Sequence, residues 1–161
     1  MANKKMTIIA SKGTLDMAYP PLLLATTAAA MDLDVTIFFT FYGLQIIRKD
    51  NTENLKISPL GNPAMSMPMP MPMPMTDLVA AMPNMEAAAT SMMKDLFKKH
   101  GVATLGELLN LAKESGVKFM ACQMTMDVMG IKQSDIIDGV EFGGAASWVD
   151  VAAESQVNLF V

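Results

Sequence analysis

Residues 117–131 read Val-Lys-Phe-Met-Ala-Cys-Gln-Met-Thr-Met-Asp-Val-Met-Gly-Ile, and this stretch decides the fold that we expect. It begins with a short apolar run that predicts a strand over Lys118 to Ala121, and it continues at helical spacing as far as Gly130. Cys122, the only cysteine of the chain, lies at the junction. In a parallel α/β sheet this junction is the carboxyl end of a strand beside the amino end of a helix, where such folds bind ligands. We therefore take Cys122 as the candidate functional residue.

Upstream of this stretch, the chain alternates between strand and helix patterns. Met6 to Ala10 predicts an interior strand, Leu15 to Met31 a helix, and Asp34 to Phe39 a second buried strand. Two strands separated by one helix form a βαβ unit, so we expect them to be parallel. Pro20 and Pro21 fall inside the predicted helix, which should therefore begin at Pro20 or kink there.

Around and beyond the cysteine the alternation continues. Further predicted elements are a short helix ending near Arg48, a helix from the capping box Thr104-Leu-Gly-Glu107 to about Ser115, a strand at Val140 to Phe142, a helix from about Ala145 to Ser155 and a strand at Val157 to Val161. Four or five strands alternating with helices predict an α/β fold, a three-layer α/β/α sandwich with a mostly parallel sheet. We expect one domain over residues 1–161.

A Met/Pro-rich insertion at about residues 55–76 interrupts this pattern. Ten of the 18 methionines lie between Met65 and Met93, and alternating prolines exclude a helix over residues 67–75. The strip could be a flap over an apolar surface, a disordered linker, or a thioether site for Cu(I). We favour the flap, because a copper site needs methionines that converge on one point. The following segment, Asp77 to Lys99, is helical in pattern with a break at Pro83.

Composition excludes several classes of function. The net charge is −4 and the lysines are scattered, which argues against nucleic-acid binding. One cysteine excludes an intrachain disulfide, and the single histidine, His100, argues against a zinc site, so we expect no metal and no cofactor. His100 follows a predicted helix and is better explained as a helix-end cation than as a catalytic base.

Hydrophobic residues make up 52% of the chain and charged residues 17%. With so many apolar residues, some apolar surface stays exposed on a single chain. We expect other copies of the chain to cover it in a homo-oligomer. The longest apolar run, Leu22 to Met31, is too short to span a bilayer, and the amino terminus leads directly into a strand without a secretory signal. We therefore expect a cytoplasmic protein.

Two segments give the chain a resemblance to a known family. These are Thr36 to Gly43, which contains Phe-Phe-Thr-Phe-Tyr-Gly, and Ala121 to Gly130, which reads Ala-Cys-Gln-Met-Thr-Met-Asp-Val-Met-Gly. With the Met/Pro-rich insertion, they resemble the DsrE/DsrF-like sulfur carriers, in the branch with a long insertion before the cysteine strand. The resemblance implies that Cys122 carries sulfane sulfur as a persulfide. It also implies rhodanese-like and TusA-like sulfur-transfer partners and an oligomer with an α/β/α sheet.

The neighbours of Cys122 give the candidate site its expected chemistry. A carrier thiol reacts as thiolate, so we expect the sulfur at the mouth of the sheet, where the start of a helix favours negative charge. The backbone N–H groups of Gln123, Met124 and Thr125 are candidates for stabilising the persulfide, and the Thr125 hydroxyl is a further donor. Candidates for the pocket wall are Lys12, in the turn after the first strand, and Phe41 and Tyr42, after the second.

Two other functions compete with the sulfurtransferase hypothesis. Free cysteine is among the most buried residue types, so Cys122 could be an inert core residue of a structural oligomer subunit. The methionine strip could instead make the chain a non-enzymatic module that binds a small ligand or Cu(I). The sequence leaves open which proteins donate and accept the sulfur, and whether the chain turns over as an enzyme.

Overall fold

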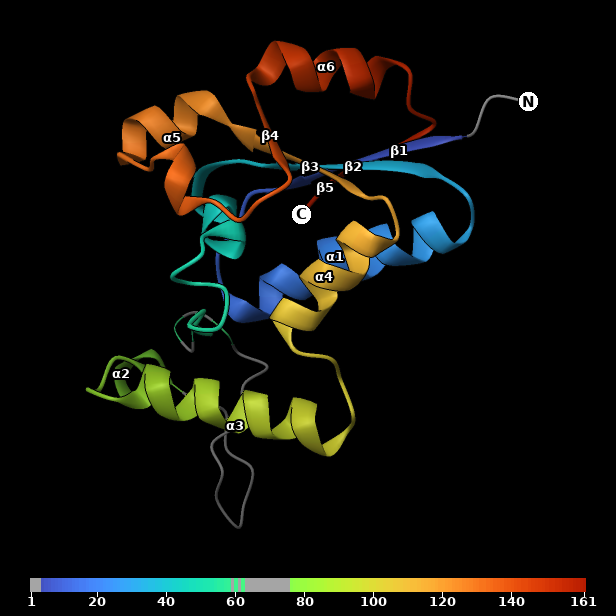
Figure 1. Cartoon of the computed structure of the whole chain (residues 1–161). Coiled ribbons are helices and arrows are strands. Elements are labelled where there is room, and N and C mark those ends of the chain that lie inside the picture. The colour runs from blue at the N-terminus through green and yellow to red at the C-terminus, as the bar shows by residue number, and fades with distance from the viewer. Residues whose placement is uncertain (1–3, 59, 61, 63–75) are drawn as a thin grey trace. The chain divides into compact units, whose positions relative to one another are not determined.

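The computed structural model describes residues 4–58, 60, 62 and 76–161, and it divides into two compact units (Figure 1). One unit contains Met1–Leu55 and Thr104–Val161, and the other contains Lys56–Ala103. The methionines at 65–75, on which the flap, linker and copper hypotheses depend, lie outside the described residues. The single-domain assignment and the role of the strip therefore stay predictions.

The first unit is built on a five-stranded sheet in the order β4-β3-β2-β1-β5. The strands are β1 (Lys5–Ala10), β2 (Asp34–Phe39), β3 (Lys118–Cys122), β4 (Val140–Gly143) and β5 (Val157–Phe160). All four neighbouring pairs are parallel. Because parallel strands need crossover connections, helices return the chain between them on either side of the sheet.

The helices of this unit lie on both faces of the sheet. The helices α1 (Leu15–Ala30) and α4 (Leu105–Glu114) cover one face, and α6 (Ala145–Ala153) lies over the other (Figure 1). Three short helices complete the unit: η1 (Phe41–Ile47), α5 (Gln123–Met129) and η2 (Gln133–Asp135). The predicted three-layer α/β/α sandwich with a parallel sheet is confirmed.

The two faces of the sheet are covered to very different extents. On the α1 and α4 face, Ile8, Ile37 and Phe39 are completely buried, and the ring of Phe119 packs edge-on against that of Phe39 at 5.5 Å between centroids. Seven residues of α1 are buried, whereas α6 contains no buried residue. Most of the hydrophobic stabilisation therefore lies on one side of the sheet.

Helix α1 departs from the sequence prediction at its prolines. It begins at Leu15, as the pattern of Leu15 to Met31 predicts, and runs through Pro20 and Pro21, so the alternative start at Pro20 is wrong. Each proline removes one backbone donor from the helix. The neighbouring side chains of Tyr19 and Leu22 are buried, and this tertiary packing outweighs the local preference.

Helix α4 begins with the predicted capping box. The Glu107 N–H donates to Thr104 Oγ1 at 3.3 Å, and the Thr104 N–H donates to Glu107 Oε2 at 2.7 Å. Two of the helix's unpaired N-terminal donors are thereby satisfied, which fixes the start of the helix that precedes the cysteine strand.

The second unit contains two helices, α2 (Asp77–Ala80) and α3 (Met85–Lys99), and the predicted break at Pro83 falls between them. Its small buried core consists of Ile57, Ala80 and Ala89. The Thr90 hydroxyl accepts a hydrogen bond from the Ile57 N–H at 3.1 Å and donates to the Glu86 carbonyl at 2.7 Å. The extended segment at Ile57 is therefore held against α3 within this unit.

Candidate functional site

Cys122 is the last residue of β3 and the N-cap residue of α5, as the sequence predicts. Helix α5 begins at the next residue, so its first backbone N–H groups lie beside the sulfur. However, the Cys122 side chain is only 3% exposed, so the sulfur is covered and does not lie open at the mouth of the sheet. The expected position at a strand end beside a helix start is present, and the thiol there is covered.

Apolar side chains cover the sulfur on the α6 face of the sheet. Cys122, Phe38 and Met120 form a buried cluster, against which Ile9 and Trp148 pack. The rings of Phe38 and Trp148 lie 6.3 Å apart with an angle of 35° between their planes. Phe38 is therefore a core residue, as the sequence predicts.

Two threonine hydroxyls form the polar side of the site. The hydroxyls of Thr40 and Thr125 lie 3.2 Å apart and share a hydrogen bond, and the Phe41 N–H donates to Thr125 Oγ1 at 3.4 Å. Thr125 is 1% exposed. Thr40 follows β2 directly. Phe39 and Ala121 are paired in the parallel register, so the next residues along the two strands, Thr40 and Cys122, lie opposite each other.

These groups change the acidity of the thiol. Burial raises the pKa of Cys122, but hydrogen bonds to the thiolate oppose this effect and hold the pKa below its usual value. The donors are the hydroxyl and N–H of Thr125, the Thr40 hydroxyl and the Met124 N–H. The neutral thiol makes no N-capping hydrogen bond of ordinary geometry, so these donors act on the charged form. A reactive thiolate is favoured without a neighbouring cation.

Phe41 and Tyr42 are exposed, and their part in a pocket wall stays a prediction. Their side chains are 52% and 67% exposed. Phe41 contributes its backbone: at φ +47° it lies in the left-handed region, which is costly for an aromatic residue, and its N–H bonds to Thr125. Lys12 is exposed, in the turn after β1.

The turn containing Lys12 packs closely against η1. A Cβ at Gly43 would lie 2.0 Å from the Ala10 carbonyl oxygen, and a Cβ at Gly13 would lie 2.2 Å from the Tyr42 carbonyl oxygen. Only glycine allows these backbones to approach so closely. The packing fixes the chain on either side of Phe41, and so fixes the Thr40 hydroxyl.

Of the other candidates, Met124 contributes through its N–H, while its side chain is 58% exposed. The Gln123 side chain donates to Asp127 Oδ1 at 2.8 Å. Sequence reasoning missed Thr40 and Trp148. Thr40 could have been found from its position after the strand that neighbours β3, whereas nothing in the sequence places Trp148 over the cysteine cluster.

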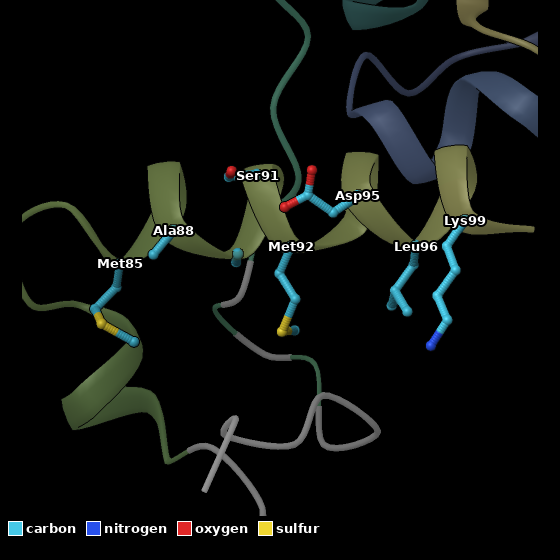
Figure 2. A pocket seen from close by; sticks show the side chains of 8 residues that line it. Met85, Ala88, Ser91, Met92, Asp95, Leu96 and Lys99 are labelled. Carbon is cyan, nitrogen blue, oxygen red and sulfur yellow. The ribbon is translucent and has the colours of Figure 1, made fainter.

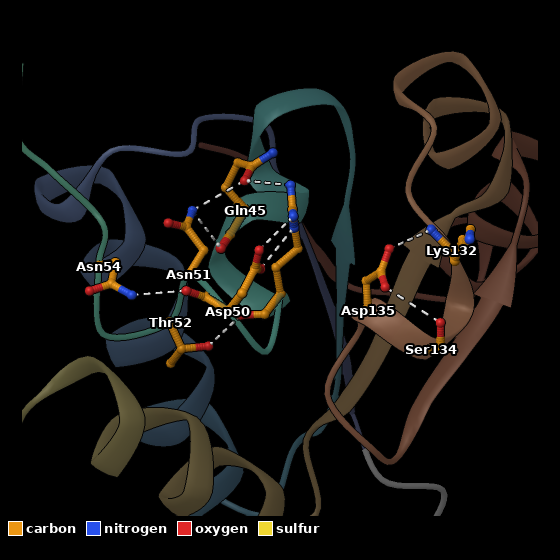
Figure 3. Close-up of polar contacts among 9 residues, drawn as sticks. Gln45, Asp50, Asn51, Thr52, Asn54, Lys132, Ser134 and Asp135 are labelled. Carbon is orange, nitrogen blue, oxygen red and sulfur yellow. Dashed lines mark hydrogen bonds and ion pairs between the residues drawn. The ribbon is translucent and has the colours of Figure 1, made fainter.

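Two separate groups of polar contacts lie at the end of η1 and in the segment after α5 (Figure 3). Arg48 forms an ion pair with Asp50 at 2.7 Å, and Asn51 Nδ2 donates to Gln45 Oε1 at 3.1 Å. Across the two segments, Arg48 pairs with Ile136 in an antiparallel bridge. Backbone hydrogen bonds from the Lys49 N–H to the Asp135 carbonyl and from the Ile137 N–H to the Ile47 carbonyl, both at 2.9 Å, join the end of η1 to the segment after α5.

The second unit contains an apolar groove of about 480 Å³ on α3, where Met92 and Leu96 point to the same side of the helix (Figure 2). Within residues 4–58, 60, 62 and 76–161, no three His, Cys, Asp or Glu side chains are placed to hold a metal ion. Over the same residues, every helix is too short or too polar to cross a membrane.

Comparisons with known proteins match the whole chain to one family. A model of the DsrE/DsrF/DrsH-like family matches residues 2–160. The chain is 48% identical over 161 residues to the sulfur carrier protein DsrE2 of Allochromatium vinosum, with both chains covered completely. It is 35% identical over 159 residues to the uncharacterized protein YrkE of Bacillus subtilis, covering 98% of this chain and 97% of YrkE.

Solved structures support the fold. The crystal structure of the YchN protein from E. coli matches with a TM-score of 0.56 at 15% identity, over 99% of this chain and 100% of YchN. The MTH1491 protein from Methanobacterium thermoautotrophicum matches with a TM-score of 0.51 at 12% identity, over 99% and 100% of the two chains. At these identities the likeness concerns the arrangement of strands and helices.

Proposed function

The chain belongs to the DsrE/DsrF/DrsH-like family, and from this membership we propose that it is a sulfur carrier which accepts and passes on sulfane sulfur as a persulfide on Cys122. The observation that carries the proposal is the position of the thiol. Cys122 lies at the start of α5, and donors from two strand ends lower its pKa. A full-length relative at 48% identity is a sulfur carrier by name.

The proposed transfer is a displacement at sulfur. The Cys122 thiolate attacks the outer sulfur of a donor persulfide, R–S–SH, and a new S–S bond forms at Cys122. The donor S–S bond breaks, and its electron pair and negative charge leave with R–S⁻. The transferred sulfur keeps its oxidation state, so the step needs no oxidant or reductant. The same displacement by an acceptor thiolate on the Cys122 persulfide returns the thiolate.

The surroundings of Cys122 suit this role. The hydroxyls of Thr40 and Thr125 are neutral donors. They stabilise a negative sulfur by hydrogen bonding, and they do not compete with it for a proton. Phe38 and Met120 exclude water and small competing thiols from the sulfur. Cys122 is the single cysteine of the chain, so no second thiol within it can resolve the persulfide into an intrachain disulfide.

Sulfur carriage implies protein partners. We infer that the chain exchanges sulfur with rhodanese-like and TusA-like proteins in the cytoplasm and acts as a homo-oligomer. Phe41 and Tyr42 on η1 and Met124 on α5 are exposed, and these helices follow the strand ends that carry the site, so they offer such partners an apolar surface. Light scattering during size-exclusion chromatography tests the oligomer, and a monomer would contradict that part of the proposal.

The persulfide is tested by intact mass measurement after incubation with a sulfane-sulfur donor. We expect the wild type to gain the mass of one sulfur atom, and to lose it again when an acceptor thiol is added. Cys122→Ser is the matched control and should gain nothing. A wild type that stays unmodified while free cysteine in the same solution is converted would rule out the proposal.

The 3% exposure of Cys122 favours one competing hypothesis, an inert core cysteine. The two hypotheses differ in the reactivity of the native protein. An inert thiol would be alkylated only at the rate of global unfolding, so that stabilising the protein would slow alkylation in proportion. A carrier thiol should react much faster than the protein unfolds, and alkylation and unfolding rates measured side by side separate the two.

A further inference from the structure

Trp148, the only tryptophan of the chain, has a buried donor that makes no hydrogen bond. It lies on α6, and its indole nitrogen is fully covered, with no partner among the residues that the structure describes. Native structures keep few buried donors unpaired, because each loses its hydrogen bonds to water without replacement. The Trp148 N–H is therefore a buried donor available to an acceptor that binds beside it.

Trp148 packs against the cluster that contains the thiol. Its ring packs on the buried cluster of Phe38, Met120 and Cys122. These three side chains share one face of the sheet, because alternate residues of a strand point to the same side and Phe38 pairs with Met120 in the register. The unpaired donor and the thiol thus belong to the same apolar layer between the sheet and α6.

The end of β4 lets α6 come close to this layer. Gly143 pairs with Cys122, and a Cβ at Gly143 would lie 3.1 Å from Ser147 Cβ and 3.2 Å from Met120 Sδ. A side chain opposite the cysteine would therefore have to displace Ser147 or Met120 by a few tenths of an ångström. The helix residue beside Trp148 already fills that position.

A persulfide adds one atom to Cys122 inside this layer. The S–S bond is about 2.05 Å long, so the outer sulfur lies about that distance from the position of the Cys122 sulfur. The Thr40 and Thr125 hydroxyls and the N–H groups of Met124 and Thr125 stabilise the negative charge of the thiolate on the Cys122 sulfur itself. The outer sulfur carries the negative charge of a deprotonated persulfide, and it needs a donor of its own in a setting that excludes water.

We propose that the Trp148 indole N–H is this donor, and that it binds the outer sulfur of a Cys122 persulfide. This inference rests on the proposed carrier function and deepens it, because it assigns the part of the site that holds the transferred atom. An indole N–H donates and cannot accept, so it favours the anionic outer sulfur over a protonated one. Trp148 would thus hold the carried sulfur and slow its loss to small thiols.

The single tryptophan makes the test direct, because the protein has one indole N–H resonance in a ¹H–¹⁵N NMR spectrum. The wild type is incubated with a sulfane-sulfur donor, and loading is followed by intact mass. On loading, we expect the indole proton resonance to move downfield and its exchange with solvent to slow. Cys122→Ser, treated in the same way, should show neither change.

The outcomes separate the two proposals. If the mass of one sulfur atom is gained and the indole resonance does not move, the inference about Trp148 is wrong and the carrier function stands. If no sulfur is gained, the carrier function fails and the inference falls with it. A shift that also occurs in Cys122→Ser would come from the donor compound itself and would equally overturn the inference.

The variant Trp148→Phe gives a second measurement, because it keeps an aromatic ring against Phe38 and removes the N–H. We expect the loaded variant to lose its outer sulfur to a small thiol roughly tenfold faster than the wild type, in line with a hydrogen bond to a charged atom. Val149→Ala, an exposed position on the same helix, controls for a weakened α6. Equal rates of loss in Trp148→Phe and the wild type would overturn the inference.

Discussion

Thr125→Val removes one hydroxyl from the candidate site and changes little else. Valine has nearly the same shape as threonine, and residue 125 is 1% exposed, so the packing of α5 against η1 is kept. The change removes the Thr125 hydroxyl from the thiolate, as well as its contacts with the Thr40 hydroxyl at 3.2 Å and the Phe41 N–H at 3.4 Å. We expect the pKa of Cys122 to rise.

The size of the effect follows from the contacts that are lost. A hydrogen bond to a charged group contributes about 1.5–3 kcal/mol, and sulfur is a weak acceptor, so the lower end applies. A loss of about 1.5 kcal/mol is about a tenfold fall in the thiolate fraction below the pKa. Thr40 and the backbone N–H groups remain, so the pKa should rise without becoming that of an apolar buried thiol.

The assay is an ultraviolet titration of the thiolate, read as the difference between each protein and its Cys122→Ser counterpart. Subtraction removes the absorbance of Tyr19 and Tyr42, and the reading does not depend on access of a reagent to the buried sulfur. Thr7→Val is the matched control, since Thr7 is completely buried in β1 and its hydroxyl bonds to Asn158. If Thr125→Val and Thr7→Val both titrate like the wild type, the reasoning about the hydroxyl is refuted.

Three further predictions concern stability. Thr104→Ala removes the hydroxyl that accepts from the Glu107 N–H, while the backbone N–H of residue 104 can still donate to Glu107, and it should lower the free energy of unfolding by about 1 kcal/mol in urea titrations, whereas Thr104→Ser should match the wild type. Gly43→Ala places a Cβ against the Ala10 carbonyl and should cost about 1–3 kcal/mol, while Gly144→Ala, with open space around it, should be close to neutral; equal losses would contradict the packing argument. Because the native pKa of Cys122 lies below that of the unfolded chain, the unfolded state binds more protons between the two values, so the stabilisation by Cys122 is present above the unfolded pKa and is lost as the pH falls through the native pKa. Urea midpoints of the wild type and Cys122→Ser should therefore diverge towards alkaline pH, and a constant difference would count against a depressed native pKa.

The part of the fold that the sequence predicts well is the part decided by local pattern. Asp34–Phe39 is a strand with the predicted bounds, because its apolar run fits a strand buried on both faces. The capping box at Thr104 forms as expected, since its donors and acceptors lie within one turn. The place of Cys122 between β3 and α5 follows from the same local logic.

What the sequence could not predict depends on contacts between distant segments. The uninterrupted course of α1 through Pro20 and Pro21 is stabilised by burial of Tyr19 and Leu22 against the rest of the unit, and the prolines alone suggest a later start. The covering of Cys122 depends on Phe38 and Trp148, which are remote from it in sequence. No local pattern fixes which apolar side chains meet over a strand end.

The uneven covering of the sheet has a consequence for its breathing motions. Helix α6 buries none of its nine residues, so separating it from the strands exposes much less apolar surface than separating α1 would. Its amide protons should exchange with deuterium long before those of β1 and β2, through fluctuations that leave the α1 and α4 layer intact. Local opening of α6 can therefore expose the covered sulfur of Cys122 to a reaction partner repeatedly, without unfolding of the whole protein.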